Sequence, residues 1–308
     1  MNNQSGVKDL SINPLEVKQL LAGLENGPVD DVLLRYLRKF SDEVQVKSTA
    51  FIHVLPPTDF FSVNEYVESI QDDQHNEEKL VRDQLRNKIE TEFSEAKTRY
   101  SIWVGEGKPL EVLLRNAEEL NSDLVVIGQK TDSSSHGITA KNFARHVKCN
   151  ALVIPDQAKF KLSKILVPVD FSENAGKALR TAIALAKALD KAPKIEVLHF
   201  FELPPNIGAY RFSETKLIQL IKDDREQALP QFVDQHVAKG DQSFLKFTVA
   251  QSVRWPIGHH IAHYATELKH DLIINGAKGH SRLGLLLLGS VTEKLLANTT
   301  RVPVLIVK

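Results

Sequence analysis

Short apolar runs alternate along the whole chain with longer segments in which apolar residues recur every three or four positions. Runs such as 124–127 and 165–169 consist almost entirely of apolar residues, which is typical of parallel strands buried on both faces. Segments such as 28–40 and 173–189 place their apolar residues along one side of a helix. The alternation predicts an α/β fold, in which right-handed helical crossovers cover both faces of a parallel sheet.

The same pattern predicts five strands in each half of the chain. They are expected near residues 19–24, 44–54, 100–104, 124–127 and 151–154, and again near 165–170, 195–200, 245–249, 272–274 and 303–306. The main helices are expected at 28–40, 63–96, 109–120, 173–189, 212–238, 256–268 and from 291 onward. Pro230 should interrupt the helix that contains it, because proline removes a backbone donor.

The second half of the chain repeats the first. Matching segments begin at Asp123 and Asp271 (271 − 123 = 148), at His53 and His199 (199 − 53 = 146), and at residues 151 and 303 (303 − 151 = 152). A nearly constant spacing carried by three strands indicates that one α/β domain was duplicated. We expect the copies to be residues 1–157 and 158–308. The linker, 156–163, has no Gly/Ser tract, so the copies should pack closely.

Composition narrows the class of protein. The chain has 308 residues, 42% of them apolar and 25% charged, which is typical of a soluble globular protein. Its formal net charge is zero, which gives no support for binding nucleic acid or an anionic membrane. Cys149 is the single cysteine, so a reducing compartment is expected. Residues 1–14 lack the apolar core of a signal peptide, and we expect a cytoplasmic protein.

The stretch 271–292 carries the strongest chemical signal. A short apolar strand is followed by Gly276, Gly279 and Gly289, then by Ser290 at the start of a helical pattern. Glycines let the backbone approach an oxygen closely, and the unpaired N–H groups of a helix start attract anions. Ser290 is expected at the N-cap. The spacing G-x2-G-x9-G-S differs from both the Walker A pattern and the dinucleotide pattern G-x-G-x-x-G.

This glycine spacing resembles that of the ATP-binding members of the universal stress protein family, and the resemblance extends over nearly the whole chain. It implies two tandem Rossmann-like domains of the adenine nucleotide α-hydrolase type, each with a five-stranded parallel sheet of order 3-2-1-4-5. It also implies ATP bound over strands one and four of the second copy, and Mg²⁺ accompanying the phosphates. The two copies would pair through their last strands as a pseudo-dimer, and further homodimerisation stays open.

The resemblance assigns nucleotide contacts to the tips of strands one, two and four and to the helix start. The acid at the tip of strand one, Asp170, would contact ribose or organise Mg²⁺; a helix-capping role is the alternative. The tip of strand two would lie near adenine, the first two glycines along the ribose and phosphates, and the helix start at the outer phosphates. The implied residues are Pro168, Val169, Asp170, His199, Phe200, Gly276, Lys278, Gly279, His280, Gly289, Ser290, Val291 and Thr292.

The first copy departs from this pattern. The loop after Gly128 lacks the middle glycine and four positions, and Ile138 stands where Ser290 would be. At the tip of strand one, Glu25 replaces the aspartate and Gly23 the proline. We therefore expect the first copy to be a structural or regulatory partner without bound ATP.

Three other features lie in or near the second copy's site. His259, His260 and His263 share one predicted helix, where they could contribute to a metal site but are better explained as surface or interdomain residues. Trp255 is expected in the core or in an interface. The apolar run 283–288 inside the glycine loop could be a lid over ATP or a contact for a partner.

The residues contain no strong catalytic set: neither a G-x-S-x-G elbow nor the kinase motifs is present. Our first hypothesis is a stress-response protein that binds ATP in its second half and acts through that bound state rather than as a fast enzyme. The alternatives are a slow ATPase with autophosphorylation at Ser290 or Thr292, and an interaction scaffold that binds no nucleotide. The sequence does not identify protein partners.

Overall fold

The structure is a computed structural model that describes residues 10–55, 67–131, 138–205, 213–279 and 288–308. Its strands form one continuous ten-stranded sheet of order β3-β2-β1-β4-β5-β10-β9-β6-β7-β8. The strands of the first half are β1 (Gln19–Leu24), β2 (Ser48–Leu55), β3 (Arg99–Glu106), β4 (Leu124–Gln129) and β5 (Asn150–Pro155). Those of the second half are β6 (Lys164–Pro168), β7 (Lys194–Phe201), β8 (Leu245–Gln251), β9 (Leu272–Gly276) and β10 (Val304–Val307).

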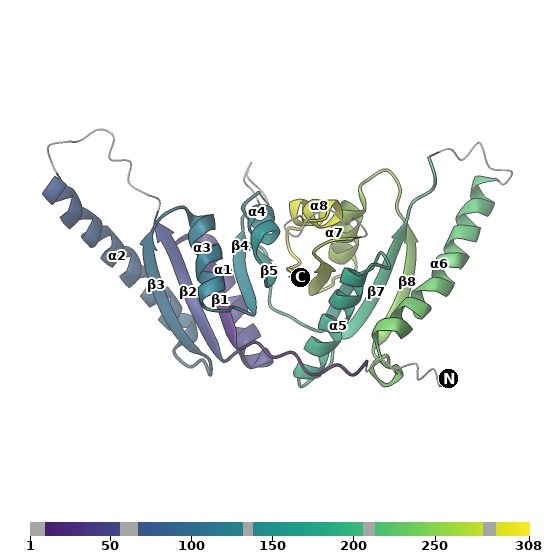
Figure 1. Cartoon of the computed structure of the whole chain (residues 1–308), viewed down its shortest axis with the longest axis horizontal. Helices are drawn as coiled ribbons and strands as arrows, with labels where there is room; N and C mark the ends of the chain where they lie inside the picture. Colours follow the sequence, from purple (N-terminus) through teal and green to yellow (C-terminus); the bar gives the residue numbers. More distant parts are fainter. Residues whose placement is uncertain (1–9, 56–66, 132–137, 206–212, 280–287) are drawn as a thin grey trace, which may run out of the picture.

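Within each half, all strand pairs are parallel and the order is 3-2-1-4-5, as the resemblance implies. The halves join through their last strands, because β10 pairs with β5 in antiparallel fashion, with Leu305 opposite Leu152. The two sheets thus become one, and the halves splay apart from this junction (Figure 1). Each half is therefore an α/β unit, and the pair forms an internal pseudo-dimer.

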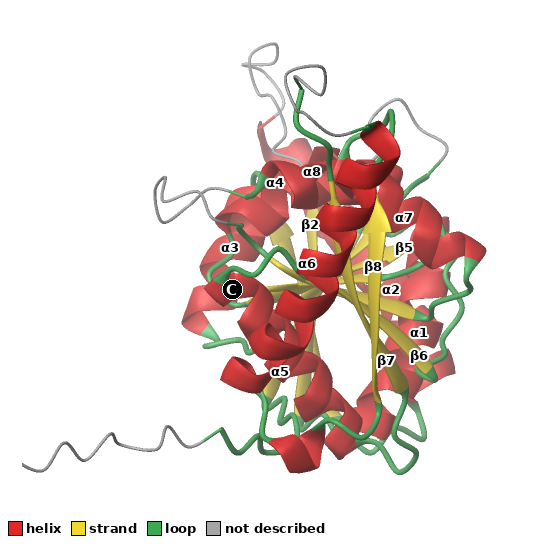
Figure 2. Ribbon diagram, turned by 90° about the vertical axis from the view of Figure 1, so that its right-hand side faces the viewer, coloured by secondary structure: helices red, strands yellow, loops and turns green. Residues whose placement is uncertain are grey.

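Helices cover both faces of the sheet (Figure 2). One face packs under α1 (Pro28–Val44), α2 (Val67–Phe93), α5 (Glu173–Ala188) and α6 (Glu214–His236). The other packs under α3 (Pro109–Glu119), α4 (Ile138–His146), α7 (Ile257–Glu267) and α8 (Ser290–Asn298). Each face has one apolar core that runs through both halves, which is what a sheet continuous across the junction requires.

Two element predictions were wrong. Helix α1 continues to Val44, so β2 begins at Ser48 rather than near residue 44. Helix α6 runs through Pro230 without interruption. The proline deletes one backbone hydrogen bond, but its neighbours Leu229 and Phe232 are buried against the sheet and hold the helix together.

Contacts beyond the sheet also tie the halves together. The amide of Gln129, at the end of β4, donates to the carbonyls of Leu296 and Thr299 at the end of α8, at 3.0 and 3.3 Å. Arg145 of α4 forms an ion pair with Glu293 of α8. These contacts make the halves one packed body, as the short linker predicts. Within the described residues, no helix combines the length and apolar character needed to cross a bilayer.

The segment before β1 crosses to the second half (Figure 1). The backbone N–H of Leu15 donates to the carbonyl of Ala184 in α5, at 2.8 Å, and Lys187 donates to the carbonyl of Ile12 at 2.7 Å. Ile12 is 6% exposed. The segment that precedes the first strand thus packs along the second half.

Candidate functional site

A cavity opens beyond the carboxyl ends of β6, β7 and β9, where ligands collect in parallel sheets. Its volume is about 280 Å³, close to the lower end of the range for ligand pockets. The starts of α5, α7 and α8 close its sides. The lining residues are Pro168, Val169, Asp170, Ala175, Leu198, Phe200, Ile257, Ile261, Asn275, Gly276, Lys278, Gly279, Gly289, Ser290, Val291 and Thr292. All the sequence-predicted site residues except His199 and His280 are among them.

The tip of β6 presents one carboxylate to this cavity. Asp170 is exposed, and its Oδ1 accepts a hydrogen bond from the backbone N–H of Ser172 at 3.0 Å. Phe171 between them has φ of +63°, and Ser172 caps α5 by accepting from the N–H of Ala175 at 3.2 Å. The tight turn lets Asp170 line the cavity, and the hydrogen bond that Asp170 accepts stabilises this turn. Ser172 is therefore the cap of α5, whereas Asp170 stabilises the turn before it through one carboxylate oxygen in that contact.

Gly276 at the end of β9 and Gly279 in the turn after it lie close to neighbouring atoms. A Cβ at Gly276 would lie 2.7 Å from the carbonyl oxygen of Asn174 in α5. A Cβ at Gly279 would lie 2.5 Å from Oδ2 of Asp170. The glycine turn therefore lies directly against the tip of β6, and the absence of side chains there leaves a cradle lined by backbone and one carboxylate. These residues fit the ribose and phosphate part of a nucleotide.

The start of α8 completes this cradle, but with a different cap from the one predicted. Gly289, not Ser290, is the N-cap: its carbonyl accepts from the N–H of Glu293 at 2.9 Å, and its own N–H donates to Ala277 at 2.8 Å. Ser290 is the first residue of the helix and is exposed, because the chain is already helical at that position. Its hydroxyl is therefore not the helix cap and can face a ligand.

Thr292 has a structural role next to the cavity. It is 2% exposed, its hydroxyl donates to the carbonyl of Gly276 at 3.1 Å, and it accepts from the amide of Asn275 at 2.9 Å. These bonds lock the first turn of α8 onto the end of β9. A hydroxyl buried in this way is a poor phosphate acceptor, which removes Thr292 as a site of autophosphorylation and leaves Ser290.

Apolar side chains form the remaining wall. Sequence reasoning missed Leu198 of β7 and Ile257 and Ile261 of α7, as well as Ala175 and Asn275. The two isoleucines are spaced i, i+4, so the helical pattern places them on one face, but only the packing of α7 against β7 turns that face toward the cavity. A cavity lined by apolar side chains and by a glycine turn suits a ligand with an aromatic base at one end and an anionic tail at the other.

His199 is placed behind the cavity rather than in it. It is 8% exposed, and its Nδ1 lies 2.8 Å from the carbonyl oxygen of Val169. His53 makes the same contact in the first half, at 2.9 Å from the carbonyl oxygen of Leu24. Because the contact occurs in both copies, it serves the fold. Burial lowers the pKa of His199. His280 and residues 283–287 of the apolar run lie outside the described residues. Leu288, the last residue of that run, is described and is buried.

The electrostatics of the cavity rest on few groups. Among the described lining residues, Asp170 is the one carboxylate and Lys278 the one cation. Burial, followed by the positive charge of Lys278, lowers the pKa of the nearby Lys308 to about 8. In the described part of the chain, no three His, Cys, Asp or Glu side chains gather as a metal site. A single carboxylate suits Mg²⁺ held mainly by phosphates and water.

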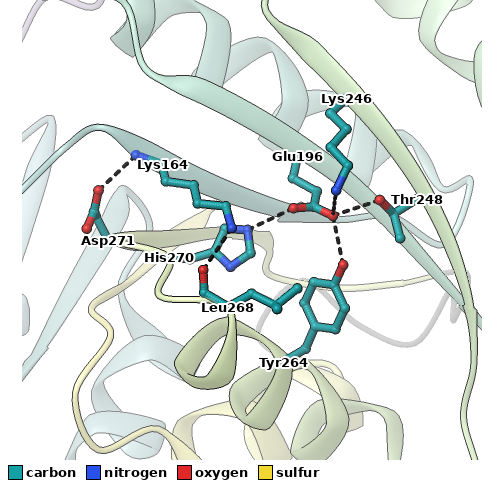
Figure 3. Close-up of polar contacts among 8 residues, drawn as sticks. All are labelled: Lys164, Glu196, Lys246, Thr248, Tyr264, Leu268, His270 and Asp271. Atoms are coloured by element: carbon teal, nitrogen blue, oxygen red, sulfur yellow. Dashed lines mark hydrogen bonds and ion pairs between the residues drawn. The ribbon is translucent and has the colours of Figure 1, made fainter.

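A buried carboxylate stabilises the helix that carries the apolar wall (Figure 3). Glu196 of β7 is 2% exposed, and its Oε1 accepts from Thr248 at 2.7 Å, Tyr264 at 2.7 Å and Lys246 at 3.0 Å. Its Oε2 lies 3.2 Å from Nε2 of His270. Tyr264 belongs to α7, so the cluster anchors the helix whose preceding turn supplies Ile261 to the cavity.

The ionisation of this cluster follows from its contacts. Burial opposes the charge on Glu196, but the hydrogen bonds from Thr248, Tyr264 and Lys246 together lower its pKa to about 2. Burial and the bond to Glu196 raise the pKa of Tyr264 to about 12. Burial, and then the charge of Lys164, lowers the pKa of His270. Glu196 is therefore an ionised acceptor held by neutral and cationic donors.

The tip of β1 in the first half differs from the tip of β6 in the residues that the structure describes there. Asp30 in the first turn of α1 is 1% exposed, and its carboxylate accepts from the N–H groups of Glu25 at 3.0 Å and Gly27 at 3.3 Å. An internal carboxylate thus uses the backbone donors at the tip of β1. Glu25 also forms an ion pair with Lys130 at 2.8 Å. The tip of β6 thus faces a cavity, whereas backbone donors at the tip of β1 bond to a side chain of the chain itself.

The histidines of α7 do not assemble a metal site in the described residues. His259 bonds Asn298 at 2.7 Å, and His260 lies 2.9 Å from the carbonyl oxygen of Val253. Both rings and that of His263 lie beside Trp255, at centroid distances of 4.6, 5.5 and 5.9 Å. Trp255 is 49% exposed, so the expectation of a core position was wrong, while the alternative of an interface residue stays a prediction.

Comparison with known proteins gives consistent matches. The model of the universal stress protein family matches residues 17–155 and again residues 161–308. Stress response protein NhaX of Bacillus subtilis is 31% identical over 176 residues, covering 48% of this chain and 99% of NhaX. Universal stress protein MJ0531 of Methanocaldococcus jannaschii is 29% identical over 146 residues, covering 47% of this chain and 81% of that protein.

A solved structure extends the likeness to the full length. The crystal structure of a universal stress protein from Archaeoglobus fulgidus is similar with a TM-score of 0.60 and 17% identity, covering 94% of this chain and 98% of that one. At this identity the likeness concerns the fold alone. It shows that the two-half arrangement occurs in another protein.

Proposed function

Since the chain belongs to the universal stress protein family, we propose that it is a stress-response protein whose second half, residues 158–308, binds ATP, while the first half, residues 1–157, has lost that site. The observation that carries the proposal is the meeting of Asp170, the glycine turn and the start of α8 around one cavity. This arrangement combines an anion cradle with an apolar wall. The lone thiol Cys149 suits a reducing cytoplasm, where ATP is available.

In this proposal each side of the cavity has a separate task. The glycine turn and the unpaired N–H groups of the first turn of α8 would hold the phosphates. Asp170 would bind the ribose or, through water, a phosphate-bound Mg²⁺. Phe200, Ile257 and Ile261 would cover the base. ATP supplies negative charge and an aromatic ring, and each finds its complement on a different wall.

The cavity offers little to accelerate hydrolysis. Beside Asp170, no second carboxylate or histidine lines it among the described residues. Asp170 already accepts one backbone bond. Positioning of a water is what fast phosphoryl transfer needs. We therefore expect binding with slow turnover at most, and a signal that depends on whether ATP is bound.

Calorimetry with Mg-ATP tests the proposal. We expect one site per chain in the wild type. Gly289→Val should weaken binding at least tenfold, about 1.4 kcal/mol, because the side chain would narrow the approach to the first turn of α8. Gly240→Val is the matched control, since a Cβ at Gly240 meets nothing within 4 Å. Absence of binding by the wild type, or equal losses in both variants, would contradict the proposal.

A further inference from the structure

We propose that the groove between the two halves is a second anion site, which takes a small molecule carrying several phosphate groups. This interdomain groove has a volume of about 1200 Å³ and is bordered by α1, the linker, the turn after α7 and the start of β10. Both halves contribute to it, so it exists only in the joined chain. It is distinct from the ATP cavity and shares no lining residue with it. Its cations are Arg35, Lys39, Lys159, Lys161, Lys269 and Arg301.

The charge of this groove differs from that of the chain. The whole protein has 39 basic and 39 acidic residues, whereas the groove combines six cations with two carboxylates, Asp156 and Asp271. Both carboxylates already serve the backbone. Asp156 accepts from the N–H and hydroxyl of Thr131, at 3.0 and 2.6 Å. Asp271 accepts from the N–H group of Ser163 at 2.9 Å. It also accepts from the N–H group of Lys164 at 2.8 Å (Figure 3).

The cations are poorly neutralised. Among the described residues, Arg35, Lys39, Lys159 and Lys269 form no ion pair. Lys161 reaches Asp271 only at 3.8 Å. Like charges gathered around one groove repel each other. The packing of four separate segments, each of which carries at least one of the cations, holds them there. A polyanion would relieve this repulsion and gain from every cation at once.

Two buried polar atoms lie beside the same groove without partners in the described structure. They are the hydroxyl oxygen of Tyr36 and Nδ1 of His270, and both residues line the groove. His270 is held by its other nitrogen, which faces Glu196. Buried polar atoms are almost always paired in native proteins, and exceptions mark sites with a further role. Of the two, the Tyr36 hydroxyl can donate to a ligand oxygen, whereas Nδ1 of His270 is itself an acceptor, because Nε2 of the neutral ring donates to Glu196.

The shape of the groove favours a small molecule over nucleic acid. The cations surround one depression instead of forming a stripe along a face. Its two aromatic residues, Tyr36 and Phe160, pack edge to face at 5.1 Å and neither is exposed, so they offer no platform for stacking bases. A compact ligand with several phosphates meets the charge requirement without needing that platform.

Calorimetric titration of the full chain with inorganic triphosphate tests this site. The titration uses the Gly289→Val protein, so that the ATP cavity does not compete for the probe. We expect binding that weakens at least tenfold in the double variant Arg35→Glu with Lys269→Glu. The matched control is Lys97→Glu with Lys177→Glu, two exposed positions outside the groove that carry the same change in charge. The control pair should weaken binding less than threefold.

Three results would overturn the proposal. The first is that triphosphate does not bind, and the second is that both double variants lose the same affinity. The third is that a single-stranded oligonucleotide binds more tightly than triphosphate and that the variant Arg35→Glu with Lys269→Glu abolishes this binding. The milder pair Arg35→Gln with Lys269→Gln repeats the test should the charge reversal unfold the chain, as judged by circular dichroism. Because ATP titration of the wild type is measured separately, failure of this site and failure of the ATP site are distinguishable.

Discussion

Replacing Tyr264 by phenylalanine tests whether the Glu196 cluster stabilises the second half. The change removes one hydroxyl, which donates a 2.7 Å hydrogen bond to a carboxylate that is 2% exposed. A hydrogen bond to a charged group contributes about 1.5–3 kcal/mol. Glu196 keeps its donors from Thr248 and Lys246, so we expect the lower part of this range, about 2 kcal/mol. For a domain of the size of the second half, a loss of 1 kcal/mol lowers the melting temperature by about 2–4 °C, so Tyr264→Phe should lower it by about 4–8 °C.

Thermal unfolding of the full chain, followed by circular dichroism, measures this loss. Tyr100→Phe is the matched control, because the Tyr100 ring packs against Phe51 and Phe93 while its hydroxyl makes no hydrogen bond recorded among the described residues. The effect of Tyr264→Phe should shrink in a Glu196→Gln background, since the charge that strengthens the bond is gone. A melting temperature within one degree of wild type, or an unchanged loss in that background, would refute the reasoning.

Three further predictions follow from single contacts. The folded pKa of Glu196, about 2, lies below its unfolded value of 4.5, so its ionised form stabilises the fold above pH 4.5, and this stabilisation is lost as the pH falls toward 2. The free energy of unfolding measured in urea should therefore fall more steeply with acid in the wild type than in Glu196→Gln. Parallel pH curves for the two proteins would contradict this. Gly276→Ala should lower the melting temperature, because its Cβ would meet the backbone of Asn174, whereas Gly279→Ala, which meets only a side-chain carboxylate, should keep stability and alter ATP affinity. Burial raises the pKa of Cys149 to about 11, so its alkylation by iodoacetamide at pH 8 should be about 100-fold slower than that of free cysteine, and a comparable rate would show the thiol to be accessible and ionised.

Much of the fold could be predicted because its information is local. Runs of buried apolar residues, helical periodicity and a repeated Asp-Leu strand start are each readable within a few residues. The repeat has a structural reason: Asp123 and Asp271 each accept backbone N–H groups at the start of the first strand of their half. The glycine turn was equally readable from its spacing, and at Gly276 the structure gives the reason, because a Cβ there would meet the backbone of Asn174. Strand order came from family resemblance rather than from these patterns.

The sequence by itself thus determined the duplicated α/β plan, the strands and the glycine turn after β9. Only the tertiary structure decided which residues from distant elements meet. Packing between elements decides that α6 continues through Pro230. It also decides that Asp30 bonds backbone donors in the first half and that Ile261 lines the cavity. The interdomain groove shows this most clearly, since its cations belong to four segments with no common pattern. Their proximity results from the antiparallel junction of β5 and β10, which no local periodicity encodes.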